Sequence, residues 1–415
     1  MNENHKNTLS TLLDNDYFPM FSVEEMACRY ANVRKEMTDK EIDILLVHGC
    51  LGLGNSPGQV NFQYLTRYAA LVETFLVVPA EGEPSMFLAM PYHVPNALEF
   101  SYVKDIRSGD CLDNIAKYVK ELHLEKGCIG IVGPGAVSYR NFTLFTEQRE
   151  TLIKNLPDAK FENATSWFNN LRLNKSKEEL EVLRRAGIIT DLAHEEVFQM
   201  TRPGVTHSDL RRAMEGVAAR HGATFPFGHI SSCSMENPTG FYPDSYPTNK
   251  RVKAGDFLMT EFTLGYGNYW GKLWGTWFVG YPTPEYEQLF KVAAKVHDNL
   301  ISGLKTGMKG SEISPFLQPI YDAGFEQTSS LLVSGWSAMN ELPFMGAAPN
   351  NPYYQIARGF DDFELKAGQA VTVHVWVNIP NTQKGLWVGS SGAFTEHGYE
   401  SFNRYPISEL RVVPI

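Results

Sequence analysis

A short stretch rich in tryptophan contains the first residues that could do chemistry. The segment 261–280, EFTLGYGNYWGKLWGTWFVG, has the pattern of a β-hairpin with glycines and an asparagine at its tip. Alternate residues of a strand point to the same face, so Trp270, Lys272 and Trp274 would share one side of the second arm. A buried charge is costly unless it is paired, so a lysine on this face requires an explanation.

An internal repeat connects this hairpin to a second one. The segment 203–222 resembles 306–324, and the segment 252–261 resembles 365–374. The repeat predicts two copies of a helix followed by a hairpin. When similar halves face each other across a pseudo-twofold axis, equivalent strands meet near the centre of a shared sheet. We therefore expect Glu261 and the equivalent His374 to be neighbours.

The elements that would position these residues fall into two domains. In the N-terminal part, amphipathic helices alternate with short apolar runs, which is typical of a small α/β domain. A second domain would begin where Ser176 and Glu179 have the spacing of a capping box before a long helix. Another helix is predicted from Thr206. The expected domains are 1–170 and 171–415.

Composition excludes several classes of partner. The 415 residues exceed the usual size of one hydrophobic core, and 43% of them are hydrophobic. A net charge of -10 and a pI of about 5.6 argue against binding to nucleic acid or an anionic membrane, which both require a positive surface. The five cysteines show no metal-ligand spacing and favour free thiols in a reducing compartment. No export signal or membrane-spanning run is visible, so we expect a cytoplasmic protein.

Taken together, these motifs carry a family resemblance. The order of a small domain, 171-LRLNKSKEELEVLRRA-186, the helix–hairpin repeat, KAGD ahead of Glu261 and KAGQ ahead of His374 resembles the creatinase, prolidase and methionine aminopeptidase superfamily. The resemblance covers nearly the whole chain. It implies an α+β fold in which a pita-bread domain, a curved antiparallel sheet covered by helices, follows a creatinase-type α/β domain. It also implies a homodimer.

The resemblance also indicates what has happened to a metal site. Metallopeptidases of this superfamily bind two metal ions through two aspartates, a histidine and two glutamates. Position by position, Glu261 and Lys272 take the places of the aspartates, a residue near Val333 that of the histidine, and His374 and a residue near Gly389 those of the glutamates. The ammonium of a lysine, the alkyl side chain of a valine and the hydrogen of a glycine cannot ligate a divalent metal. We therefore expect no metal and no cofactor, with Lys272 supplying the missing positive charge in an ion pair with Glu261 across the hairpin.

Metal-free members of the superfamily, creatinase and ectoine hydrolase, imply hydrolysis of a C–N bond in a small molecule. We expect a metal-independent hydrolase for a polar, zwitterionic or heterocyclic substrate. Glu261 would orient the substrate or act as a general base, His374 would shuttle a proton, and Lys272 would stabilise developing negative charge. The catalytic histidine of creatinase is not retained. His229 and Glu236, from the same substrate-facing segment, are candidates to replace it in catalysis and substrate binding.

Four tryptophans are candidates for substrate binding. They lie on the predicted faces of Lys272, His374 and Gly389, which point inward in the family fold. Their rings could surround a quaternary ammonium or sulfonium group, stack on a flat heterocycle, or fill space left by absent ions. Trp277 and Trp336 are predicted to be packing residues. The four candidates are Trp270, Trp274, Trp376 and Trp387.

Three other functions remain open from the sequence. The chain could be a non-catalytic binding protein that retains the scaffold, and the discriminating feature is whether the tryptophans seal Glu261, Lys272 and His374 away from solvent. It could also be a lyase that abstracts a proton from a small cationic zwitterion. A metal-dependent peptidase is disfavoured, because only Glu261 keeps a carboxylate among the five aligned positions.

Overall fold

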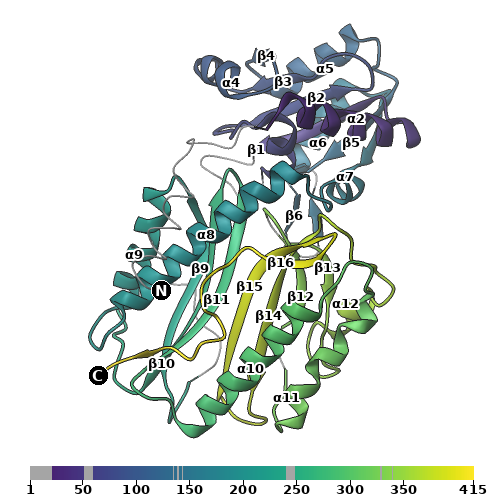
Figure 1. Cartoon of the computed structure of the whole chain (residues 1–415). Coiled ribbons are helices and arrows are strands. Elements are labelled where there is room, and N and C mark those ends of the chain that lie inside the picture. Colours follow the sequence, from purple (N-terminus) through teal and green to yellow (C-terminus); the bar gives the residue numbers. More distant parts are fainter. Residues whose placement is uncertain are drawn as a thin grey trace. The chain divides into compact units, whose positions relative to one another are not determined.

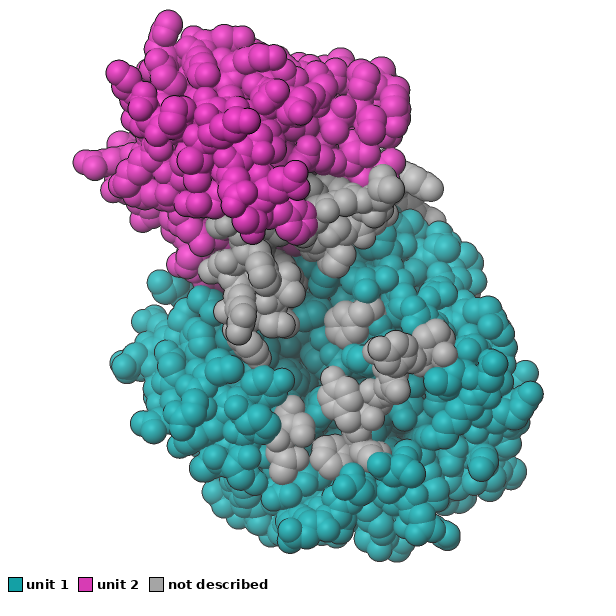
Figure 2. All heavy atoms as spheres, turned by 180° about the vertical axis from the view of Figure 1, so that it is seen from behind, with its two compact units in different colours: residues 1–20, 174–415 teal, residues 21–173 magenta. Residues whose placement is uncertain are grey.

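The structure is a computed structural model that describes two compact units of the chain. The units span 21–173 and 174–415 and are coloured separately in Figure 2. Both combine helices and sheets, which agrees with the predicted α+β class. No helix in the described ranges is long and apolar enough to cross a membrane. The described residues are 21–50, 59–133, 135–137, 140–142, 144–239, 248–327, 330–338 and 340–415.

The unit 21–173 contains a six-stranded sheet in the order β4-β3-β2-β1-β5-β8 (Figure 1). Its strands are β1 (Ile44–Cys50), β2 (Thr74–Pro79), β3 (Ser85–Leu88), β4 (Asp105–Ser108), β5 (Cys128–Val132) and β8 (Lys160–Asn163), with a separate hairpin of β6 (Gly135–Val137) and β7 (Arg140–Phe142). Its helices are α2 (Val23–Asp39), α3 (Val60–Thr66), η1 (Pro91–His93), α4 (Val94–Phe100), α5 (Cys111–Glu121), α6 (Thr146–Asn155) and α7 (Thr165–Leu171).

The central strand β1 explains why this sheet forms. Leu45 and Val47 pack in one hydrophobic cluster, whereas Ile44 and Leu46 pack in another. Successive side chains of a strand point to opposite faces, so both faces of the sheet are covered. A strand buried on both faces has a nearly continuous apolar sequence, as residues 44–47 of β1 do.

The unit 174–415 is built on a nine-stranded sheet, whose main path runs β13-β12-β14-β15-β11-β10-β9. The strands are β9 (Thr224–Ser234), β10 (Asp256–Tyr266), β11 (Tyr269–Val279), β12 (Val333–Trp336), β13 (Asn340–Met345), β14 (Ala370–Asn378), β15 (Gly385–Thr395), β16 (Gly398–Ser401) and β17 (Val412–Val413). The helices are α8 (Lys177–Met200), α9 (His207–Arg220), α10 (Pro284–Gly303), η2 (Gly310–Glu312), η3 (Ser314–Leu317), α11 (Gln318–Asp322) and α12 (Tyr354–Arg358).

The predicted helix starts are present, but the two repeats are unequal. Ser176 and Thr206 form capping boxes at the starts of α8 and α9. In the second repeat, the segment predicted to match α9 forms the short pieces η2, η3 and α11 instead of one helix. Pro315 and Pro319 lie at the starts of η3 and α11, and proline cannot continue a preceding helix. The repeat predicted one helix before each hairpin, and the second copy instead has a series of short helices.

Helix α8 covers the first half of the sheet and decides which way β11 faces (Figure 1). A Cβ atom at Gly271 would lie 2.4 Å from the backbone of Ala186 in α8, so only glycine fits there. Trp277, on the same side of β11, contacts the ring of Phe198 in α8. The alternate residues of β11, which include Lys272, therefore face away from the helix.

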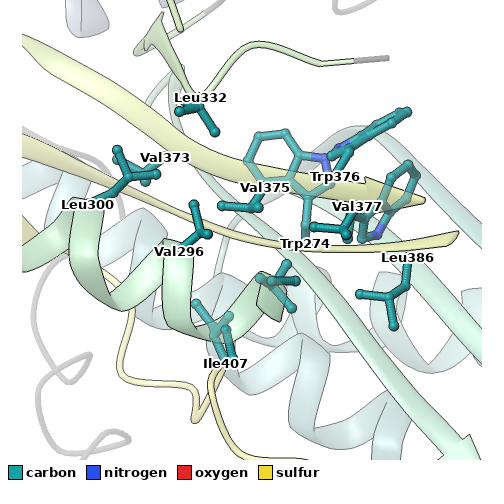
Figure 3. Packing of buried hydrophobic residues seen from close by; sticks show 14 of the residues in the cluster. Trp274, Val296, Leu300, Leu332, Val373, Val375, Trp376, Val377, Leu386 and Ile407 are labelled. Atoms are coloured by element: carbon teal, nitrogen blue, oxygen red, sulfur yellow. The ribbon is translucent and has the colours of Figure 1, made fainter. Parts of the chain in front are cut away.

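Helix α10 covers the second half of the sheet in the same way. Val296 and Leu300 of α10 pack with Val373 and Val375 of β14 in one hydrophobic cluster (Figure 3). Because these valines face the helix, His374 between them faces the opposite side of the sheet. Figure 2 shows the unit from behind, on the side away from α8 and α10, where its surface is hollowed.

Candidate active site

The candidate site residues lie in one row across five neighbouring strands. In an antiparallel sheet, residues that pair across strands project on the same face. The register pairs each member of the row with the next, and the seam between the two halves of the sheet is the pair Trp274 with Gly389. Trp274 and Gly389 stand between Glu261 and His374, which are thus members of one row without being adjacent. From β9 to β14, the row is His229, Glu261, Trp274, Gly389 and His374.

The predicted ion pair between Lys272 and Glu261 is present. Lys272 Nζ lies 2.6 Å from Glu261 Oε1, and the two residues are 5% and 7% exposed. The same ammonium lies 3.8 Å from the ring centroid of Trp336 and 4.6 Å from that of Trp274. Burial lowers the pKa of Lys272, and the adjacent Glu261 carboxylate opposes that shift. The positive charge is therefore held by one carboxylate and two aromatic faces.

The imidazole of His374 is fixed on three sides. Its ring stacks on Trp274, with centroids 4.6 Å apart and an interplanar angle of 13°. Nδ1 lies 2.6 Å from Ser330 Oγ, and Nε2 lies 3.2 Å from Ser334 Oγ. Burial, aided by the positive charge of Lys272, lowers the pKa of His374 to about 3. His374 is therefore neutral at physiological pH, so it can accept a proton at the ring nitrogen that carries none.

The low pKa of His374 has a consequence for stability. Between its ordinary value of 6.5 and about 3, a protonated form exists only in the unfolded chain, so acid favours unfolding. We expect the free energy of unfolding to fall as pH drops below 6.5, with His374 contributing about 1.4 kcal/mol per pH unit. Denaturant titrations at several pH values would give the slope of the free energy of unfolding against pH. This slope should be shallower for His374→Gln than for wild type. An unchanged slope would contradict the low pKa.

His229 and Glu236 have different surroundings, although His229 lies in β9 and Glu236 lies just after the end of that strand. His229 Nε2 lies 3.9 Å from Glu261 Oε2, so the two oxygens of this carboxylate face Lys272 and His229. The side chain of His229 is 15% exposed, more than those of Lys272 and Glu261. Glu236 is exposed beyond the end of β9, and its backbone N–H donates to Ser234 Oγ. Within the described ranges, no contact joins its side chain to Glu261 or Lys272.

The tryptophans have separate roles. Trp274 joins the ion pair to His374, as described above. Trp274 and Trp336 together form a lysine cage, the two rings that cover the Lys272 ammonium. Trp270 contacts the ring of Trp336, with centroids 5.8 Å apart, and therefore lies beside this cage. Trp376 and Trp387 contact each other at 4.4 Å, and the fully buried Trp387 donates its indole N–H to the Thr260 carbonyl at 3.0 Å. Trp387 is thus placed to support Trp376 and has no exposed surface to offer a substrate.

Gly389 shows why the centre of the row has no side chain. A Cβ atom there would lie 2.7 Å from His374 Cβ and 2.8 Å from Trp274 Cε3. Because real Cβ contacts are longer, Gly389→Ala must push the stacked rings apart. We expect the free energy of unfolding to fall by about 1–3 kcal/mol. Urea denaturation would measure this, with Gly216→Ala, where a Cβ has more room, as the comparison. Equal effects of the two substitutions would contradict the close packing.

The residues at the aligned metal positions do not fit a pair of divalent ions. Glu261 is the one carboxylate, and Lys272 places an ammonium where a second carboxylate is required. Val333 packs in the core on the α10 side, and Gly389 has no donor atom. Both ring nitrogens of His374 are engaged by serines. No cluster of three or more histidine, cysteine, aspartate or glutamate side chains suited to a metal occurs among the residues that could be described.

Three residues of the site were missed by sequence reasoning. Trp336 was predicted to be a packing residue, but it forms one face of the lysine cage. Ser330 and Ser334 contact His374 and were not considered. All three come from the region of Val333, where the resemblance places a metal-binding histidine. That alignment was the available signal, since the segment was already expected to face the site.

Comparison with known proteins gives a consistent family assignment. A model of the metallopeptidase family M24 matches residues 181–400, and a model of the creatinase/prolidase N-terminal domain matches residues 29–174. An ectoine hydrolase from Halomonas elongata is 24% identical over 74% of this chain and 79% of its own length. A creatinase from a Bacillus species is 20% identical over 94% of this chain and 92% of its own length.

Solved structures support the fold. An X-Pro aminopeptidase from Thermotoga maritima has a TM-score of 0.74 and 17% identity, covering 92% of this chain and 99% of its own. A Xaa-Pro dipeptidase from Bacillus anthracis has a TM-score of 0.73 and 21% identity, covering 94% and 100%. At such low identity the likeness extends to the fold alone.

Proposed function

Because the chain belongs to the metallopeptidase family M24, we propose that it is a hydrolase that cleaves a C–N bond in a small polar molecule without a metal ion. Two relatives that match this chain over most of their length, the ectoine hydrolase and the creatinase, bear names that fit such chemistry. The single observation that carries the proposal is the buried ion pair of Lys272 with Glu261. The family resemblance aligns the position of this ammonium with a metal ligand of the metallopeptidases.

Each charged or titratable group then has a role. Glu261, kept in place by Lys272, and the adjacent His229 orient the polar groups of the substrate by hydrogen bonding. The neutral His374 takes a proton from the nucleophile and returns it to the leaving nitrogen. The field of Lys272 stabilises the negative charge that develops on the substrate.

Two unsatisfied polar atoms support a ligand at this place. Trp274 Nε1 and Thr263 Oγ1 are buried and have no hydrogen-bond partner among the described residues. Trp274 pairs with Glu261 across the strands, and Thr263 pairs with Lys272, so both belong to the site face. Buried polar groups are normally hydrogen-bonded, and polar groups of a substrate would satisfy these two.

The test is turnover in the presence of a strong metal chelator. Small amides, guanidino compounds and cyclic amidines would be screened by ammonia or amine release, with wild type and His374→Ala compared. We expect at least one compound to be hydrolysed by wild type with chelator present, and much more slowly by the variant. Activity that disappears with chelator and returns with a stoichiometric divalent ion would contradict metal independence.

A binding function without catalysis is the second candidate, and one observation favours it. The ammonium of Lys272 is covered by Trp336 and Trp274, so these aromatic faces already hold a cation that belongs to the protein. If none of the screened compounds turns over but one binds by calorimetry, and its binding is weakened in Glu261→Gln, the scaffold acts as a receptor for a small polar ligand.

A further inference from the structure

The imidazole of His374 lies between two serine hydroxyls, and the hydrogen bonds decide which ring nitrogen carries the proton. Ser330 Oγ lies 2.8 Å from the carbonyl oxygen of Leu331 and donates its one proton there. It can therefore only accept at its 2.6 Å contact with His374, so Nδ1 carries the N–H. A neutral imidazole has one N–H, which leaves Nε2 as an acceptor. Ser334, 3.2 Å from Nε2, donates its hydroxyl proton to it.

This arrangement has the form of an activated nucleophile. A hydroxyl that donates to a fixed imidazole, whose other nitrogen is held by a third group, is the recurring arrangement in covalent hydrolysis. Here Ser330 supplies the third group, and the Trp274 ring and the bond from the His374 backbone N–H to the Leu332 carbonyl (3.0 Å) fix the imidazole. Ser334 is 7% exposed and His374 is 9% exposed.

Two similar serine–histidine pairs in the same unit have serines with no exposed surface. Ser232 lies 2.9 Å from His207 Nε2, and Ser390 lies 2.9 Å from His297 Nε2, but both serines are fully buried. His297 belongs to α10 and His207 to α9, so these two pairs join strands to their covering helices. The pair of Ser334 and His374 instead lies on the sheet face that carries Glu261 and Lys272.

We infer that Ser334 is the nucleophile of the proposed C–N hydrolysis, so this inference rests on that proposed function. Ser334 Oγ forms a bond to the electrophilic carbon of the substrate while its proton passes to His374 Nε2. The C–N bond then breaks as Nε2 returns this proton to the leaving nitrogen. A water molecule attacks the resulting ester, giving one proton to Nε2, which passes it to Ser334 Oγ as the ester bond breaks. Ser330 is a positioning residue that holds the imidazole in the required tautomer.

The charges of the site are compatible with this step. Protonating His374 alone is unfavourable, because the ring is buried and close to the positive charge of Lys272. In the proposed step, a negative charge develops on the substrate as the proton reaches Nε2, so the net charge of the buried site does not change. The field of Lys272 opposes the imidazolium but favours the substrate anion.

The experiment uses 4-nitrophenyl acetate as an acyl probe and identifies the modified residue by peptide mass spectrometry. We expect acetylation of wild type at Ser334 and none at that position in Ser334→Ala. Ser330→Ala should be acetylated at least roughly 100-fold more slowly, because general-base assistance requires the correct tautomer. Ser232→Ala, which removes a serine–histidine hydrogen bond outside the site, should react as wild type. Circular dichroism and thermal melts would establish that each variant is folded.

The outcomes separate this inference from the proposed function. Folded wild type that is not acetylated, or is acetylated elsewhere, overturns the role of Ser334. Amide turnover in chelator that survives in Ser334→Ala also overturns it while leaving the hydrolase proposal intact, with water as the nucleophile. Acetylation at Ser334 that is slowed in Ser330→Ala supports the nucleophile, even if no C–N compound in the screen is cleaved and the proposed function fails. Ser334→Cys should recover acetylation at position 334.

Discussion

Lys272→Met is expected to lower the free energy of unfolding by about 3–5 kcal/mol, because it leaves Glu261 as a buried charge without its cation. Methionine nearly preserves the length of the side chain and its contact with Trp336. The loss of stability therefore reports mainly the removal of the positive charge. Only 7% of Glu261 is exposed, and water cannot replace the ammonium that lies 2.6 Å from its Oε1. Urea denaturation followed by tryptophan fluorescence and circular dichroism would measure the effect.

A second substitution tests the assigned cause. In Lys272→Met combined with Glu261→Gln, the buried carboxylate is gone, so we expect part of the lost stability to return. Lys384→Met provides a matched control, because Lys384 forms a partly exposed pair with Glu285 at 3.4 Å and surface pairs contribute little. A Lys272→Met protein as stable as wild type would mean that the ammonium does not balance Glu261.

His374→Gln is expected to lower kcat by roughly 10²–10⁴-fold on any substrate found in the screen, the usual contribution of a general acid–base group. Glutamine can still hydrogen-bond to Ser330 and Ser334 but cannot take up and return a proton. Because the pKa of His374 is lowered to about 3, its base form persists well below pH 6.5, and turnover should not decline there as it would with an ordinary histidine. Steady-state kinetics across pH would check both points.

Two further variants test whether the fall in kcat of His374→Gln is specific to the role of this residue in catalysis. His194 on α8 is also buried, has a pKa lowered to about 3 and contacts Thr260 Oγ1 at 3.1 Å, but it lies on the helix side of the sheet. His194→Gln should therefore leave kcat unchanged. Glu261→Gln should raise KM more than it lowers kcat if Glu261 orients the substrate. A His374→Gln enzyme with wild-type kcat would remove His374 from the mechanism.

These expectations share one physical basis. Glu261 is buried and requires a nearby positive charge, since an unpaired buried carboxylate is strongly disfavoured. Lys272 provides that charge, and the aromatic faces of Trp274 and Trp336 replace the water or oxygen atoms that would otherwise surround it.

Local sequence patterns determined much of this protein. The capping boxes at Ser176 and Thr206 predicted the starts of α8 and α9, because a cap depends on residues only three positions apart. Alternation within the hairpin predicted that Lys272 shares a face with Trp274, since a hairpin is a local structure. The resemblance added the fold and the ion pair of Lys272 with Glu261.

Only the tertiary structure decided which residues complete the site. Trp336 reaches Lys272 from β12, and Ser330 and Ser334 reach His374 from the same region, although these segments are distant in sequence. The seam that pairs Trp274 with Gly389 places the indole beneath His374. Such contacts depend on the register between distant strands, which is set by packing across the whole sheet and not by any local pattern.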